Sequence, residues 1–282
     1  MFFWMQWKGC YNIWKINPDM TEIRRFPITL RKLTVLAVED IAPRLRKISL
    51  GGPELSAFTN EAGTQGEFIS LGPDDHVKIF FPDAVSNILT LPTQETGRLR
   101  WPRDPSAISR EYTPRLYDPE SGKLDLEFVL HDHGIAGQWA AETKVGDQIH
   151  IAGPKASMLM PAAARAILFG DETAIPAIAN WLAMRPASMH IKAFIFSDDP
   201  DMQQLLRQAE NVELNWLEQA PDTAEAFIDL IKPLALSADD FLWGACERSS
   251  ADALRSAVKS LNLPSERCDI SNYWTRGQIS EE

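Results

Sequence analysis

The chain has 282 residues, 45% of them hydrophobic and 24% charged, with a formal net charge of −11 and a pI near 5.0. That length suits two domains, and an acidic chain with no basic run argues against nucleic-acid binding and against broad attachment to anionic lipid. The three cysteines, Cys10, Cys246 and Cys268, are too few and too widely spaced for a disulfide framework or a zinc site, so we expect a cytoplasmic protein without a metal centre of its own.

Residues 1–27 form an arm whose role the sequence leaves open. The first twenty are rich in aromatic side chains, but Gln6, Lys8 and Asn12 interrupt the apolar run, which is too short to span a bilayer. The run also lacks the basic start and the cleavage site of a secretory signal. We therefore expect no integral membrane contact.

Residues 28–154 read as short strands. Their apolar and polar residues alternate, which is typical of half-buried strands, and turns rich in Gly, Pro and Asn separate them. Together with a strand carrying Arg110, they predict an antiparallel six-stranded barrel with one brief helix. The other five expected strands are Thr29–Val38, Arg44–Leu50, His76–Phe81, Lys123–His131 and Gln148–Ala152.

Residues 155–282 alternate strands and helices, which predicts a doubly wound parallel α/β domain beginning near Gly153-Pro154. In such sheets ligands bind beyond the carboxyl ends of the strands. The site candidates there are Asp171 to Thr173, Ser197 to Asp199, Cys246-Glu247 and Tyr273-Trp274. The expected strands are Ala166–Gly170, His190–Ser197, Val212–Leu217, Phe241–Ala245 and Arg267–Ile270, and the expected helices are Ala174–Met184, Asp201–Ala209, Thr223–Leu230 and Ser250–Leu261.

The segment Arg110-Glu111-Tyr112-Thr113-Pro114-Arg115 carries the most chemistry. On a strand, Arg110 and Tyr112 share one face, where a guanidinium could meet a diphosphate and a phenol a flat ring. Thr113 could offer its hydroxyl or its backbone N–H to the N5 edge of a flavin. An ordinary charged strand end explains these six residues equally well.

A second segment, His131 to Ala140, follows a strand and leads into a short helix with small residues at its start. Free N–H groups and the helix dipole there favour an anion. The two histidines, His131 and His133, could instead be solvated loop residues. A zinc pair would need a third ligand, and none is evident.

Together these segments resemble the siderophore-interacting protein family, a branch of the ferredoxin-NADP reductase superfamily. The resemblance covers about residues 30 to 277, with departures at Ile135 (usually Pro), Gly137 (usually Ser) and Cys246 (often Gly). The matching motifs are His76-Val77-Lys78-Ile79-Phe80-Phe81-Pro82, Arg110-x-Tyr112-Thr113, Val129-Leu130-His131, Gly134 to Trp139, Gly146-Asp147, Asp171 to Ala177 and Tyr273-Trp274-x-x-Gly277.

The resemblance implies an FAD-dependent ferric-siderophore reductase that uses NADPH or NADH and needs no catalytic acid, base or nucleophile in its central step. We expect it to be a monomer. The expected FAD and nucleotide contacts are Arg110, Tyr112, Thr113, His131, His133, Gly134, Ile135, Ala136, Gly137, Trp139, Asp171, Glu172, Thr173, Ala174, Ser197, Glu247, Tyr273 and Trp274.

The nucleotide and the acceptor stay open. A carboxylate at Asp198-Asp199 would favour NADH, although these residues could simply cap the next helix, and Arg207 or Arg248 could reach a 2′-phosphate. For an anionic ferric siderophore we expect contacts from Lys78, with Arg46 and Arg98 behind it. The alternatives are a flavin reductase with a protein or quinone acceptor, and a siderophore carrier without catalysis.

Overall fold

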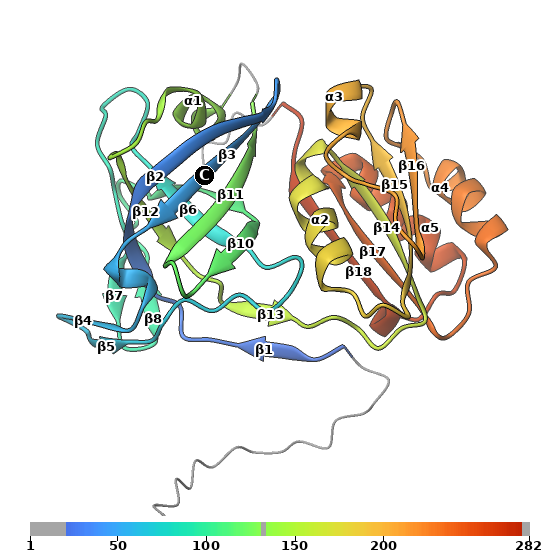
Figure 1. Cartoon of the computed structure of the whole chain (residues 1–282), viewed down its shortest axis with the longest axis horizontal. Helices are drawn as coiled ribbons and strands as arrows, with labels where there is room; N and C mark the ends of the chain where they lie inside the picture. Colours follow the sequence, from blue (N-terminus) through green and yellow to red (C-terminus); the bar gives the residue numbers. More distant parts are fainter. Residues whose placement is uncertain (1–20, 131–133, 278–282) are drawn as a thin grey trace, which may run out of the picture.

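The alternating segments of the first half form strands that curl into one antiparallel sheet. The computed structural model describes residues 21–130 and 134–277, and its N-terminal lobe is this sheet, in the order β10-β11-β3-β2-β12-β6-β9 (Figure 1). One face of each strand is buried in a shared apolar core that includes Leu33, Ile48 and Ile79. The strands are β2 (Leu30–Ala42), β3 (Leu45–Gly51), β6 (Val77–Phe81), β9 (Ile108–Tyr112), β10 (Pro114–Asp118), β11 (Lys123–Val129) and β12 (Gln148–Ala152).

The two end strands of this sheet, β9 and β10, are consecutive in the chain and separated only by Thr113. β9 pairs with β6 at one end of the sheet, and β10 pairs with β11 at the other. One bent strand therefore closes the sheet, and counting β9 and β10 as one gives the six strands that the sequence predicts. A short helix, α1 (Ile135–Glu142), packs against β11 and β3.

Several short strands escape the pattern analysis because they are only three residues long. β1 (Ile23–Arg25) pairs with β13 (Ala156–Met158), so the end of the expected N-terminal arm joins the segment between the two lobes. Two small hairpins complete the lobe, β4 (Phe58–Asn60) with β5 (Gly63–Gln65) and β7 (Thr93–Glu95) with β8 (Arg98–Arg100).

The second lobe is a five-stranded parallel sheet in the order β16-β15-β14-β17-β18, flanked by helices on both faces as expected (Figure 1). The direction of the strand order reverses between β14 and β17, which makes that crevice the topological switch point. The strands are β14 (Arg165–Asp171), β15 (His190–Phe196), β16 (Val212–Leu217), β17 (Asp240–Glu247) and β18 (Cys268–Trp274), and the helices are α2 (Ile175–Met184), α3 (Pro200–Gln203), α4 (Ala224–Ile231) and α5 (Arg248–Ser260).

Two glycines let helices approach this sheet closely. A Cβ at Gly170 would lie 2.6 Å from the Cβ of Ala174, and one at Gly244 would lie 2.5 Å from Leu254. α2 packs on the face toward the first lobe, while α4 and α5 cover the other face (Figure 1). None of the helices in residues 21–130 and 134–277 is long and apolar enough to cross a membrane.

Two expected elements differ in extent. The helix predicted over Asp201–Ala209 ends at Gln203, where the chain continues in tight turns in which the N–H of Leu205 donates to the carbonyl of Met202. The last strand extends from the predicted Ile270 to Trp274. Tyr273 and Trp274 therefore lie on β18 itself.

The lobes meet along α2. Ala42 and Leu45 of the first lobe are buried in the same cluster as Ile178 and Trp181 of α2. The buried side chain of Asn180 donates to the carbonyls of Pro73, at 3.1 Å, and Pro114, at 2.9 Å. Its own oxygen accepts from Arg115 at 3.1 Å, so one amide joins the barrel to the parallel sheet.

We expect Asn180→Ala to lower the free energy of unfolding by about 1–3 kcal/mol, because the substitution leaves buried polar groups without partners. Urea unfolding followed by tryptophan fluorescence measures the loss. Asn272→Ala, which replaces an exposed asparagine on β18, is the control and should change stability little. Equal stability of both variants would show that Asn180 does not hold the lobes together.

Candidate functional site

Arg110 and Tyr112 lie on the same face of β9, opposite Ile79 and Val77 of β6. Both side chains are partly buried, and burial lowers the pKa of Arg110 and raises that of Tyr112. The Arg110 guanidinium also donates to the carbonyl of Ser109 at 2.7 Å. A cation and a phenol thus stand two residues apart on one face, as the sequence predicts.

An aromatic cluster joins Tyr112 to the second motif. The ring of Phe128 on β11 lies 4.2 Å from the Tyr112 ring and 5.5 Å from the Trp139 ring, between centroids. Trp139 also contacts Phe81 at 5.8 Å. The structure therefore brings the two motifs together through a shared apolar wall.

The helix that begins at Ile135 presents its first turn without a side-chain cap. Its N-cap is Gly134, whose φ of 94° suits glycine, and no side chain there accepts a hydrogen bond from the helix. Ala136 and Gly137 are buried behind it. The first-turn N–H groups and the helix dipole suit an anion. His131 and His133 lie outside the described residues.

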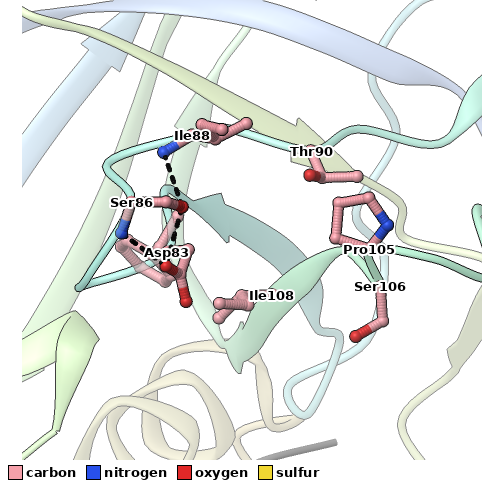
Figure 2. Close-up of a pocket in the computed structure, with 8 residues that line it drawn as sticks. Asp83, Ser86, Ile88, Thr90, Pro105, Ser106 and Ile108 are labelled. Atoms are coloured by element: carbon pink, nitrogen blue, oxygen red, sulfur yellow. Dashed lines mark hydrogen bonds between the residues drawn. The ribbon is translucent and has the colours of Figure 1, made fainter.

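A pocket of about 310 Å³ lies at the start of β9 (Figure 2). Ile108 lines it from the face of β9 that also carries Arg110 and Tyr112, and Ser106 lines it from the segment just before the strand. Figure 2 shows Thr90 and Ile88 on the opposing loop. A hydrogen-bonded turn fixes that loop, in which the Asp83 carboxylate accepts from the N–H and hydroxyl of Ser86. The remaining lining residues are Phe81, Asp83, Ser86 and Pro105.

Asp171, the last residue of β14, is the centre of a second site at the switch point. Its carboxylate accepts from the N–H and hydroxyl of Thr173, from the N–H of Glu247 at 2.9 Å, and from the indole of Trp274 at 2.8 Å. Burial raises the pKa of Asp171, while these hydrogen bonds oppose the rise. Four of the residues expected to contact FAD or the nucleotide thus form one network. The neighbouring Cys246 has a pKa raised by burial to about 12, so its thiol is protonated.

Glu172 and Ser197 lie directly after the carboxyl ends of β14 and β15, next to the Asp171 network. The Ser197 hydroxyl donates to Glu172 at 2.7 Å, and Arg44, from the turn between β2 and β3, donates to the same carboxylate at 2.8 Å. Arg44 also lies 3.6 Å from Asp199, which caps α3 by accepting from the N–H of Asp201. Ala174 is buried at the start of α2.

Thr113 faces the second lobe. Burial raises the pKa of the Tyr273 phenol and Thr113 opposes that rise, and the phenol donates to the carboxylate of Asp74. The other oxygen of Asp74 accepts from the indole of Trp243 at 3.0 Å. Burial raises the pKa of Asp74 to about 7, although these two hydrogen bonds lower it. The sequence reasoning missed Asp74, Trp243 and Arg44. The acidic pair directly before the His76–Phe81 strand was the one available signal.

The three cationic side chains expected to contact the siderophore, those of Lys78, Arg46 and Arg98, lie on different parts of the barrel lobe. Lys78 donates to Glu111 at 2.6 Å and lies 5.9 Å from the centre of the Trp101 ring. Arg46 lies on β3, separated from β6 by β2 and β12, where it pairs with Asp40 and donates to the last carbonyls of α1. Arg98 pairs with Glu95 on the β7–β8 hairpin. Among residues 21–130 and 134–277 no cluster of three or more potential metal ligands occurs.

Comparison with known proteins gives two family matches that follow one another along the chain. The "Siderophore-interacting FAD-binding domain" matches residues 34–158, and the "Siderophore-interacting protein" matches residues 163–277. The chain is 31% identical to the NADPH-dependent ferric-chelate reductase of Escherichia coli, covering 92% of this chain and 98% of the relative. It is 27% identical to the ferric vibriobactin reductase of Vibrio cholerae, covering 89% and 91%. A siderophore utilization protein from T. fusca, of known crystal structure, superposes with a TM-score of 0.79 at 29% identity, covering 93% of this chain and 98% of that one.

The raised pKa of Asp74 makes stability depend on pH. A carboxyl whose pKa is about 7 in the folded protein and 3.8 ordinarily holds more protons when folded, so its contribution to stability falls as pH rises from about 4 to 7. Between pH 5 and 8 we expect this group alone to cost roughly 2 to 3 kcal/mol. Urea unfolding at several pH values should therefore give a flatter profile for Asp74→Asn than for the wild type. Parallel profiles would contradict the assignment.

Proposed function

This chain belongs to the siderophore-interacting protein family, and we propose that it passes electrons from NADPH or NADH through FAD to an iron(III) siderophore, releasing iron(II). The observation that carries the proposal is that the chain has two such sites. One is the Arg110–Tyr112 face of the barrel, and the other is the Asp171 network at the switch point of the parallel sheet. The first suits a flavin nucleotide and the second a nicotinamide nucleotide. The printed names of the E. coli and V. cholerae relatives support the iron acceptor.

The donors on the barrel fit FAD. Arg110 and the uncapped start of α1 supply positive charge and N–H groups for a diphosphate, and Tyr112 offers an aromatic surface for a flat ring system. When bound, FAD accepts a hydride from the nicotinamide and releases electrons singly to iron. Thr113 lies at the barrel end nearest the parallel sheet, where its hydroxyl would meet N5. The chain's own part in the central step is to position the flavin and the nicotinamide against each other and to exclude water.

The pocket of Figure 2 fits the adenosine part of such a cofactor. Ile108 and Thr113 are five residues apart on the strand, a span of about 16 Å at 3.3 Å per residue. A ligand whose flat ring lies at Tyr112 and whose phosphates lie at Arg110 would reach the pocket with its far end. A mononucleotide would end at the phosphates, so the pocket favours FAD over FMN.

We place the nicotinamide nucleotide at the carboxyl edge of β14, β15 and β17. The residues that line that edge are Thr173, Ala174, Ser197 and Glu247. Trp274 of β18 lies beside them, where its indole donates to Asp171. Arg44 offsets only part of the charge of Glu172 and Asp199, and Asp198 adds a further carboxylate, so this edge by its charge favours NADH over a 2′-phosphate. The E. coli relative is named for NADPH.

For the iron chelate we place the contact at Lys78 and Trp101, the ammonium–indole pair beside β9. The hydrogen bond from Lys78 and the charges of His76 and Lys78 keep the pKa of Glu111 below its ordinary value, although burial opposes them. Lys78 is thus oriented by a carboxylate. We place the reaction in the cytoplasm, which supplies reduced nicotinamide nucleotides.

The defining experiment is anaerobic titration of the FAD-loaded protein with NADPH and, separately, NADH. We expect the flavin absorbance to bleach and then to return on addition of a ferric siderophore, while a chromogenic trap reports iron(II). Two iron(II) should appear for each nucleotide consumed, because a hydride carries two electrons. Bleaching without iron(II) from any ferric chelate would instead favour the reductase with a protein or quinone acceptor.

A second prediction separates the two parts of the FAD site. Ser106→Trp should fill the pocket and weaken FAD binding at least about tenfold, or about 1.4 kcal/mol, while FMN binding stays unchanged. Arg110→Ala should weaken both flavins, because a phosphate contact to a guanidinium is worth about 1.5–3 kcal/mol. Flavin fluorescence titration of the apoprotein measures both constants.

The control for this pair is Ser121→Trp, a serine in the turn between β10 and β11 that should leave both flavins bound as in the wild type. Equal loss of FAD and FMN in the Ser106 variant would mean that the pocket does not receive adenosine. Unchanged FAD affinity in Arg110→Ala would place the diphosphate elsewhere.

A further inference from the structure

The carboxyl end of β15 lies level with that of β14, because Phe196 pairs with Asp171 in the parallel register. In a strand–helix–strand unit of this kind, side chains after the second strand read the 2′ position of the adenine ribose. A carboxylate there accepts from the 2′-hydroxyl of NADH, whereas an arginine accommodates the 2′-phosphate of NADPH. The residues that follow β15, Ser197 to Asp199, therefore bear on which nucleotide the chain accepts.

These residues form one hydrogen-bonded group with Glu172. The buried hydroxyl of Ser197 donates to Glu172 Oε1 at 2.7 Å and accepts from the N–H of Asp199 at 3.1 Å. The Asp199 carboxylate accepts from the N–H of Asp201 at 2.9 Å, which fixes it at the start of α3. Asp198, between Ser197 and Asp199, is exposed. Two carboxylates are thus held in place, and a third is open to solvent beside them.

Arg44 reaches this group from the barrel lobe. Its guanidinium donates to both oxygens of Glu172, at 2.8 and 3.3 Å, and lies 3.6 Å from Asp199. Its backbone carbonyl accepts from the N–H of Leu130 at 2.8 Å, which anchors the turn between β2 and β3. In the part of the chain that the structure describes, Arg44 is the one cation that pairs with Glu172, Asp198 or Asp199. Three carboxylates against one guanidinium leave this edge with two formal negative charges.

The other arginines that the sequence offers for a 2′-phosphate lie elsewhere. Ala209, two residues after Arg207, bridges to Val212, the first residue of β16, so the chain at Arg207 has returned toward the amino edge of the sheet. Arg248 follows β17, which lies on the opposite side of β14 from β15, and its Nε donates to the Thr275 hydroxyl at 3.0 Å. Neither arginine stands at the end of β15.

We propose that this chain takes its electrons from NADH and discriminates against NADPH. The inference rests on the proposed function, which puts the nucleotide at this edge. Asp198 and Asp199 accept from the ribose hydroxyls, and a 2′-phosphate in the same place would bring about two further negative charges against them. Arg44 touches no reacting atom and is a positioning residue that holds Glu172 and Asp199. The chain would differ in this respect from its E. coli relative, which is named for NADPH.

Two nucleotide fragments test the proposal without electron transfer. The FAD-loaded protein is titrated in a calorimeter with ADP-ribose and with 2′-phospho-ADP-ribose, which differ only in the 2′-phosphate. We expect ADP-ribose to bind at least about a hundredfold more tightly, because juxtaposed like charges weaken binding of the wrong ligand strongly. The same preference should appear in kcat/KM for NADH over NADPH with ferricyanide as the acceptor, an assay that needs no siderophore.

Variants of the carboxylates and of Arg44 should move this preference in opposite directions. Asp198→Asn combined with Asp199→Asn removes two charges and keeps the side-chain shapes, and asparagine still caps a helix. The preference for ADP-ribose should then fall at least about tenfold. Arg44→Gln removes the one cation, so it should raise the preference by about threefold or more. A merely structural role of Arg44 would instead weaken both fragments alike.

The matched control is Glu210→Gln combined with Asp239→Asn. It removes the same two charges at the amino edge of the sheet, where both residues are exposed just before β16 and β17. The ratio of the two affinities should stay as in the wild type. A ratio that moved equally in both double variants would mean that the overall charge of the protein, and not the end of β15, makes the choice.

Equal affinity for the two fragments in the wild type, or tighter binding of the phosphorylated one, would overturn the choice of NADH and leave a ferric reductase that uses NADPH. A preference unchanged by the Asp198 and Asp199 substitutions would overturn the role of these carboxylates. Conversely, a protein that prefers NADH in both assays but gives no iron(II) from any ferric siderophore would support this inference and overturn the acceptor. The two proposals can therefore fail separately.

Discussion

The bend at Thr113 is the constraint on which the rest of the structure depends. One continuous strand pairs with β6 before the bend and with β11 after it, so it closes the barrel. The same bend turns Thr113 toward Tyr273 of the other lobe, while Arg110 and Tyr112 keep the face that leads to the pocket. Barrel closure, the expected cofactor face and the contact between the lobes therefore share one short stretch of backbone.

Polar groups at the interface hold the two lobes in register, and each is satisfied from the opposite side. Asn180 of α2 donates to two carbonyls of the barrel, and Asp74 of the barrel accepts from Trp243 and Tyr273 of the parallel sheet. Apolar contact alone would allow the lobes to slide, whereas a buried polar group without its partner is costly. This specificity has its own cost, because the interface carries a carboxyl whose charge burial disfavours.

The sequence predicts the architecture well where periodicity is strong. The five barrel strands and the alternating second half appear close to their expected bounds, and Asp171, Thr173, Glu247 and Trp274 meet because parallel strands end at a common edge. It fails where the determining contact is non-local. Nothing in the local sequence pairs Asp74 with Trp243, 169 residues away, or places Arg46 across the barrel from Lys78. The helix expected over Asp201–Ala209 stops early at Gln203, and no Gly or Pro within that range marks its end in the sequence.

The charge distribution bears on how an anionic chelate would reach such a protein. A net charge of −11 repels anions at long range, and Lys78 is already paired with Glu111 at 2.6 Å. Long-range steering is therefore no basis for recognition, because salt would screen a repulsion between the protein and the chelate. Recognition would instead depend on short-range contact, in which the chelate lies on the Trp101 ring and competes with Glu111 for the ammonium of Lys78. A contact of this kind tolerates chelates of different shape, because an indole face and a single flexible ammonium impose little geometry.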